Sequence, residues 1–133
     1  MKAQLIGLAG LAFLSPVAWA QAAPPGPGQP TISATPSYSQ QTLLKNWATS
    51  VCLATVARSP EAKDDANATA SAYMEFGKQP LAAYAPLRDL AVSFAKRTYA
   101  GASPSEFNTM KCIDLMHSKE LDALTARLAN SAK

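Results

Sequence analysis

Apolar side chains recur every three or four residues over most of the stretch from position 41 to position 128, which is the spacing of one face of an α-helix. No segment shows the alternation of apolar and polar residues, or the enrichment in β-branched residues, that is typical of a strand. Prolines and glycines divide the stretch into segments of helical length. The sequence therefore predicts an all-α fold, a compact bundle of four to five helices.

Two helices are expected in the first half of this stretch. The first covers residues 41–57, with Ser39 as its N-cap and with Pro60 just after its end, because a proline has no amide to donate. The second covers residues 61–76 and ends at Gly77. Its small side chains recur at helical spacing and are expected to face another helix; they are Ala62, Ala66 and Ala70.

Two or three further helices are expected in the second half. The third begins after Pro80 and continues to residue 99 or 100, with Thr98 on its buried face. Pro86 predicts either a later start near residue 85 or a kink, because it removes a backbone hydrogen bond. After a loop, residues 110–128 form either one helix that bends near Ser118 or two separate helices.

The first twenty residues have the pattern of a secretory signal peptide. Lys2 gives a short positive start, residues 5–17 are an almost uninterrupted apolar run, and the motif Ala18-Trp19-Ala20 has the small side chains that a signal peptidase recognises. An uncleaved anchor is the weaker interpretation, because the run is shorter than the roughly twenty residues that span a bilayer. We expect a signal peptide at 1–20, cleavage before Gln21, and a mature chain in the periplasm, free of the membrane.

A Pro-rich flexible spacer is predicted at residues 21–39, which contain too few large apolar side chains to fold. The folded domain is then residues 40–133, which is enough for one small core. The net charge of the whole chain is only +3 and is evenly spread, so nucleic acid is not an expected partner.

Cys52 and Cys112 are the only two cysteines in the chain. In an exported protein an even number of cysteines favours a disulfide over a free nucleophilic thiol, because the compartment is oxidising. We predict one bridge, which joins the first helix to the fourth and stabilises the fold by about 4 kcal/mol in the chain-entropy model.

The residue types offer no clear catalytic or metal site. His117 is the single histidine, and although Asp114 lies one helical turn before it, no nucleophile is placed to use the imidazole as a base. Three acidic residues near the start of the second helix lack the glycine of a calcium loop and suit the positive end of a helix dipole; they are Glu61, Asp64 and Asp65. We therefore predict a protein that is not an enzyme, with no catalytic residue, no metal and no cofactor.

Four blocks of sequence carry a resemblance to a known family. They are residues 46–54 (NWATSVCLA), 65–77 (DANATASAYMEFG), 84–90 (YAPLRDL) and 109–121 (TMKCIDLMHSKEL). Together they resemble type VI secretion amidase immunity proteins, specifically the class that neutralises the fourth family of amidase effectors. The resemblance implies a periplasmic helical protein that forms a homodimer and inhibits a secreted peptidoglycan amidase, a papain-like enzyme with a cysteine nucleophile and a histidine base.

The resemblance further implies that a protruding loop between late helices fills the substrate cleft of the amidase. The corresponding loop is expected at residues 101–108. Its predicted partner-binding residues are Gly101, Ser103, Pro104, Ser105, Glu106, Phe107 and Asn108. Among them, Ser103, Ser105 and Glu106 are expected to make polar contacts and Phe107 to be an apolar anchor. The alternative for this segment is a plain connector.

A small disulfide-bonded periplasmic chaperone is the alternative function. This alternative predicts that acid opens the fold and that the exposed surface then binds many client proteins. The chain has one histidine and few carboxylates, so few of its groups would change charge in acid. The immunity function is therefore the better interpretation.

Overall fold

The computed structural model describes residues 33–131, so the predicted signal peptide and most of the predicted spacer lie outside the described residues. Within them the chain forms five α-helices and two short 3-10 helices, and no strand. The α-helices are α1 (Gln40–Val56), α2 (Pro60–Glu75), α3 (Tyr84–Ala95), α4 (Asn108–Met116) and α5 (Lys119–Asn130). The prediction of an all-α bundle is confirmed. Not one of these helices combines the length and the apolarity needed to cross a membrane.

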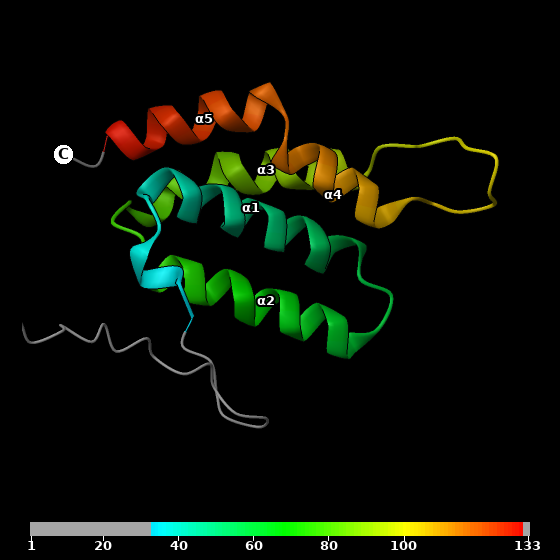
Figure 1. Ribbon diagram of the computed structural model, residues 1–133, viewed down its shortest axis with the longest axis horizontal. Coiled ribbons are helices and arrows are strands. Elements are labelled where there is room, and N and C mark those ends of the chain that lie inside the picture. The colour runs from blue at the N-terminus through cyan, green and yellow to red at the C-terminus, as the bar shows by residue number, and fades with distance from the viewer. Residues whose placement is uncertain (1–32, 132–133) are drawn as a thin grey trace, which may run out of the picture. The chain divides into compact units, whose positions relative to one another are not determined.

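Helix α1 is the centre of the bundle, because it packs against each of the other four α-helices (Figure 1). It begins where predicted, with the hydroxyl of Ser39 accepting a hydrogen bond from the amide of Thr42 at 3.1 Å. Helix α2 packs mainly on α1, whereas α3 also contacts α4 and α5. In the predicted spacer, the described residues include a 3-10 helix at Thr35–Ser37, and Thr35 is buried.

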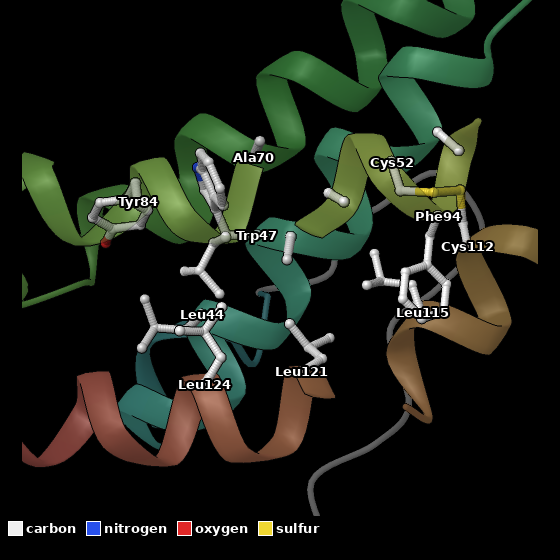
Figure 2. Close-up of a cluster of buried hydrophobic side chains, with 14 residues drawn as sticks. Leu44, Trp47, Cys52, Ala70, Tyr84, Phe94, Cys112, Leu115, Leu121 and Leu124 are labelled. Atoms are coloured by element: carbon white, nitrogen blue, oxygen red, sulfur yellow. A yellow bond between two sulfur atoms is a disulfide. The ribbon is translucent and has the colours of Figure 1, made fainter. Parts of the chain in front are cut away.

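The core lies where α1 meets α3, α4 and α5 (Figure 2). Trp47 of α1 meets Tyr84 of α3 edge to face, with 4.9 Å between the ring centroids. The largest side chains with almost no exposed surface are Leu44, Leu87, Phe94, Leu115 and Leu121. These five side chains come from four different helices, so their burial in one core holds the four helices together.

A disulfide joins Cys52 of α1 to Cys112 of α4, with 5.6 Å between the two Cα atoms (Figure 2). The predicted pairing is confirmed. Both cysteines are buried in the core. The bridge therefore fixes α4, and with it the end of the loop that precedes α4, on the central helix.

The start of α3 follows from Pro86. A 3-10 helix at Leu81–Ala83 comes first, and the α-helix begins at Tyr84. This start places the proline in the first turn, where its missing amide breaks no helical hydrogen bond. Of the two predicted alternatives, the later start is confirmed.

The end of α3 comes earlier than predicted, at Ala95 rather than at residue 99 or 100, and Thr98 is exposed rather than buried. The side chains that follow, Lys96 and Arg97, are charged, so a longer helix would bury little more apolar surface. The guanidinium of Arg97 instead stacks on the ring of Phe94, with 3.2 Å between Cζ and the ring centroid. The connection to α4 is correspondingly longer.

A serine separates the last two helices. The hydroxyl of Ser118 accepts a hydrogen bond from the amide of Leu121 at 3.2 Å and donates one to the carbonyl of Leu115 at 2.8 Å. It is the N-cap of α5. The chain therefore forms two helices here, and the alternative of one bent helix is wrong.

Replacing this cap is expected to weaken the fold measurably. Ser118→Ala should lower the free energy of unfolding by about 1 kcal/mol, because the first turn of α5 loses the acceptor of one of its amides. Urea unfolding followed by circular dichroism measures the change. Ser71→Ala, on the exposed face of α2, is the matched control and should change the free energy of unfolding by less than about 0.5 kcal/mol. Equal losses in the two variants would contradict the capping role.

Candidate partner-binding surface

The segment 96–107 connects α3 to α4 and extends beyond the ends of the helices (Figure 1). We call it the projecting loop. Residues 100–106 within it are all exposed. The loop was predicted at residues 101–108, and the structure changes both limits: it begins earlier because α3 ends at Ala95, and Asn108 is the first residue of α4.

The outermost part of the loop consists of small side chains. Residues 102–105, which we call the tip, are Ala-Ser-Pro-Ser, and all four are exposed. Inside the tip, the amide of Ser105 donates to the carbonyl of Ser103 at 2.9 Å. This turn leaves the hydroxyl of Ser103 and the ring of Pro104 facing solvent, so both can contact a partner.

Phe107 and Gly101 meet at the base of the tip. Phe107 has a left-handed backbone, with φ 52° and ψ 37°, and among residues 33–131 it is the one non-glycine residue with positive φ. Its ring lies directly over Gly101, since a Cβ atom placed on that glycine would be only 2.6 Å from Cζ of the ring. Phe107 is half-buried. The predicted apolar anchor therefore packs within its own loop.

Glu106 is held by two side chains from either side. Its Oε2 atom lies 3.0 Å from Nη2 of Arg58, in the connection between α1 and α2, and accepts a hydrogen bond from Nδ2 of Asn108 at 2.9 Å. Asn108 in turn accepts a hydrogen bond at 2.9 Å from Nζ of Lys111, which is buried. The pKa of Glu106 is lowered, first by the hydrogen bond from Asn108 and then by the hydrogen bond and the positive charge of Arg58. The carboxylate therefore stays ionised at neutral pH.

The first half of the loop is attached to α4 by a tyrosine. The hydroxyl of Tyr99 donates to Oδ2 of Asp114 at 2.6 Å, and this hydrogen bond is the main reason that the pKa of Tyr99 is raised. The spacing of the sequence had suggested a contact of Asp114 with His117, but Asp114 pairs with Tyr99 instead. His117 is exposed, is the C-cap of α4, and makes no side-chain hydrogen bond within residues 33–131.

An open groove lies beside the loop, between the end of α1, the start of α2 and the start of α4. Large apolar side chains line it, and three of them are notably exposed: Leu53 at 38%, Met110 at 47% and Ile113 at 51%. Ala62, predicted to face another helix, lines this groove and is exposed, whereas Ala66 and Ala70 are buried as predicted. Ala62 therefore faces the groove and not another helix.

The acidic residues of α2 lie on an exposed helix start. Ser59 is the N-cap, and its hydroxyl accepts from the amide of Ala62 at 3.2 Å. Hydrogen bonds from backbone and from Ser59 lower the pKa of Glu61, which is the effect expected at the positive end of a helix. Within the part of the chain that the structure describes, no three histidine, cysteine or acidic side chains come together as metal ligands would.

Sequence reasoning missed the two cationic members of this site, Arg58 and Lys111. Arg58 is far from the loop in the sequence, and no local pattern links it to Glu106. The groove was missed because Leu53 and Ile113 fit the apolar period of their helices and so looked like core residues. In the fold these two side chains line the groove and stay exposed.

Residues 42–125, more than half of the chain, match the family model Tai4, described as type VI secretion system (T6SS), amidase immunity protein. No curated protein sequence matches the chain.

Three solved structures contain similar chains. The structure of the effector-immunity system Tae4/Tai4 from Salmonella typhimurium has one that is 47% identical, with a TM-score of 0.70, covering 73% of this chain and 96% of that one. The Tae4-Tai4 complex from Enterobacter cloacae has one that is 27% identical, with a TM-score of 0.65 and coverage of 73% and 99%. A structure described as new type VI-secreted toxins and self-resistance proteins in Serratia marcescens has one that is 28% identical, with a TM-score of 0.68 and coverage of 82% and 87%.

The family match over residues 42–125 includes all four blocks in which the resemblance was found. The family match over residues 42–125 and the 47% identity to a chain of an effector-immunity system lead to one conclusion. The chain belongs to the family of type VI secretion system amidase immunity proteins.

Proposed function

We propose that this chain is an immunity protein that binds a type VI amidase effector and inhibits it by placing the projecting loop in the substrate cleft. The family match supports binding to such an effector. Similar chains from Salmonella typhimurium and Enterobacter cloacae come from structures of effector-immunity pairs. In this proposal the chain carries out no reaction, because blocking a cleft requires a complementary surface and no catalytic group.

The observation that carries the proposal is the projecting loop itself. A cleft that accepts the peptide stem of peptidoglycan also admits an irregular segment of backbone with small side chains. The tip has this shape, since residues 102–105 are small and exposed. A segment already held in one conformation loses less conformational entropy on binding than a flexible one, and the contacts at Gly101 and Glu106 hold it.

The tip alone is too small for the whole interface. Stable protein complexes bury roughly 1,200–2,000 Å² in total, and four small residues supply only a fraction of that area. The apolar groove beside the loop is the adjacent surface best suited to extend the contact, since Leu53, Met110 and Ile113 are exposed there. We therefore propose that the effector contacts both the tip and the rim of this groove.

We place the mature chain in the periplasm, where an amidase that cleaves peptidoglycan meets its substrate. The predicted signal peptide and the buried disulfide support this location, because such bridges persist in oxidising compartments. Self-association as a homodimer stays a prediction of the family resemblance. The family match gives no support to the chaperone alternative.

Titration of the purified mature chain into a cognate amidase tests the proposal. Release of peptide fragments from peptidoglycan should fall in proportion to the added chain and end near stoichiometric equivalence. An amidase of an unrelated family, titrated in parallel, is the control and should keep its activity. Unchanged cleavage by the cognate amidase at stoichiometric excess would refute the proposal.

A further inference from the structure

We infer that Gly101, Phe107 and Arg58 are positioning residues that hold the tip, residues 102–105, in the conformation that inhibits the amidase. The inference rests on the proposed function and assigns a different task to each part of the loop. The tip contacts the amidase, whereas Glu106 and Phe107, which the sequence predicted as contacts, hold the base of the loop.

The first support is the contact that closes the loop on itself. Gly101 precedes the tip and Phe107 follows it, and the ring of Phe107 occupies the space that a side chain at position 101 would need, 2.6 Å from the position of a Cβ atom. A bulky residue adopts a left-handed backbone only where its surroundings hold it there, and Phe107 does so at φ 52°. The amide of Phe107 also donates to the hydroxyl of Ser105 at 3.2 Å. The two arms of the loop are therefore joined where the tip begins.

The second support is the attachment of the loop to a distant part of the chain. Arg58 lies between α1 and α2, and its guanidinium is 3.0 Å from the carboxylate of Glu106. The same carboxylate oxygen also accepts the hydrogen bond from Asn108, so an amidase that bound this oxygen would have to displace one of two existing partners. Arg58 thus sets the direction of the loop, and the Oε2 atom of Glu106 is already occupied.

The two attachments are of unequal strength. The side chains of Arg58 and Glu106 are 75% and 66% exposed, and exposed ion pairs contribute little each. The contact of Gly101 with Phe107 is steric, since a Cβ atom at position 101 can be placed only if the far end of the Phe107 ring moves away. If a variant holds the inhibitory conformation for only a fraction of the time, its affinity falls by that fraction. We therefore expect a small effect from the ion pair and a larger effect from position 101.

Exchange of the two charges tests the role of Arg58. Arg58→Glu and Glu106→Arg, each alone, should weaken inhibition of the cognate amidase by about fivefold, because two like charges then repel. The double variant should inhibit better than Glu106→Arg alone, since the ion pair is restored with its charges reversed while the hydrogen bond from Asn108 stays lost. Arg88→Glu, on the exposed side of α3, is the control for a change of net charge and should have no effect. A double variant that inhibits no better than Glu106→Arg would overturn the inference for Arg58, because restoring the ion pair would then have no effect.

Substitution at the other attachment is the second test. Gly101→Ala should weaken inhibition by about tenfold or more, because the added methyl displaces the ring of Phe107. Hydrogen exchange of the free protein should speed up at residues 103–107 while the helices keep their protection. Ala82→Ser, exposed in the 3-10 helix before α3 and outside the loop and the groove, is the control and should change neither. Inhibition and loop exchange equal to the wild type in Gly101→Ala would overturn the inference.

The two hypotheses fail in different ways. If the wild-type chain does not inhibit a cognate amidase, the proposed function fails, while loop exchange in the free protein still tests the attachment. If the wild type inhibits but the charge exchange gives no recovery, the proposed function stands and the positioning role is refuted.

Discussion

Replacement of the tip by a flexible sequence of the same length is expected to weaken inhibition of the amidase by at least about a hundredfold. The variant carries Gly-Gly-Ser-Gly at residues 102–105, so that all four native residues are replaced. Binding energy is concentrated in a few central residues, and the tip is the part of the chain that enters the cleft in the proposed complex. A glycine-rich tip would also have to be ordered on binding, at a cost in entropy. The inhibition constant for peptidoglycan cleavage measures the effect.

The same variant should fold as the wild type does. The tip is exposed, and none of its side chains belongs to the core, so the midpoint of thermal unfolding should change by less than about 2 °C. The matched control carries Ala68→Ser and Ala72→Ser on the exposed face of α2 and should inhibit normally. Full inhibition by the tip variant would move the main interface from the loop to another surface, with the apolar groove as the first to examine.

Removal of the disulfide is expected to lower the free energy of unfolding by about 2–4 kcal/mol. Cys52 and Cys112 are separated by 60 residues, so the bridge restricts the unfolded chain over more than half of the domain. Both are buried beside Phe94 and Leu115, and replacing each by alanine also removes atoms that pack in the core (Figure 2). Urea unfolding of Cys52→Ala/Cys112→Ala measures the loss.

The wild-type chain with its disulfide reduced is the control for this variant. It keeps both sulfur atoms, so any difference between the two reports the packing of sulfur and not the covalent link. Reduced protein should also inhibit more weakly, since Cys112 holds α4 and α4 holds the end of the projecting loop. Equal stability of oxidised and reduced protein would show that packing alone keeps α1 and α4 together.

Much of the bundle could be predicted from the sequence because its signals are local. Ser39, Ser59 and Ser118 each accept a hydrogen bond from an amide of the following helix, and a serine before an apolar period is a recognisable start. The cysteine pair could be predicted because two cysteines allow one intramolecular pairing. The serine caps depend on residues a few positions apart, and the disulfide follows from the number of cysteines. Neither prediction requires knowledge of how the helices pack.

The features that were missed depend on how distant segments meet. The end of α3 was placed too late, because Thr98 continues the helical period although no helix packs over it. Arg58 could not be connected with Glu106, since their contact arises from the position of the α1-α2 connection beside the loop. Phe107 was expected to be an apolar anchor for the partner, and its packing over Gly101 within the loop could not be predicted from the sequence. Each miss concerns the surface near the loop, where a single sequence carries the least information about packing.

The positions of the two linked cysteines affect the order in which the protein matures. In the proposed export the N-terminal part of the mature chain crosses the membrane first, so Cys52 cannot form its native bridge until Cys112 has also emerged. The projecting loop precedes Cys112 by only a few residues and crosses just before it. Protection against the incoming enzyme therefore starts only when nearly the whole polypeptide has been translocated, and a molecule stalled halfway would offer none.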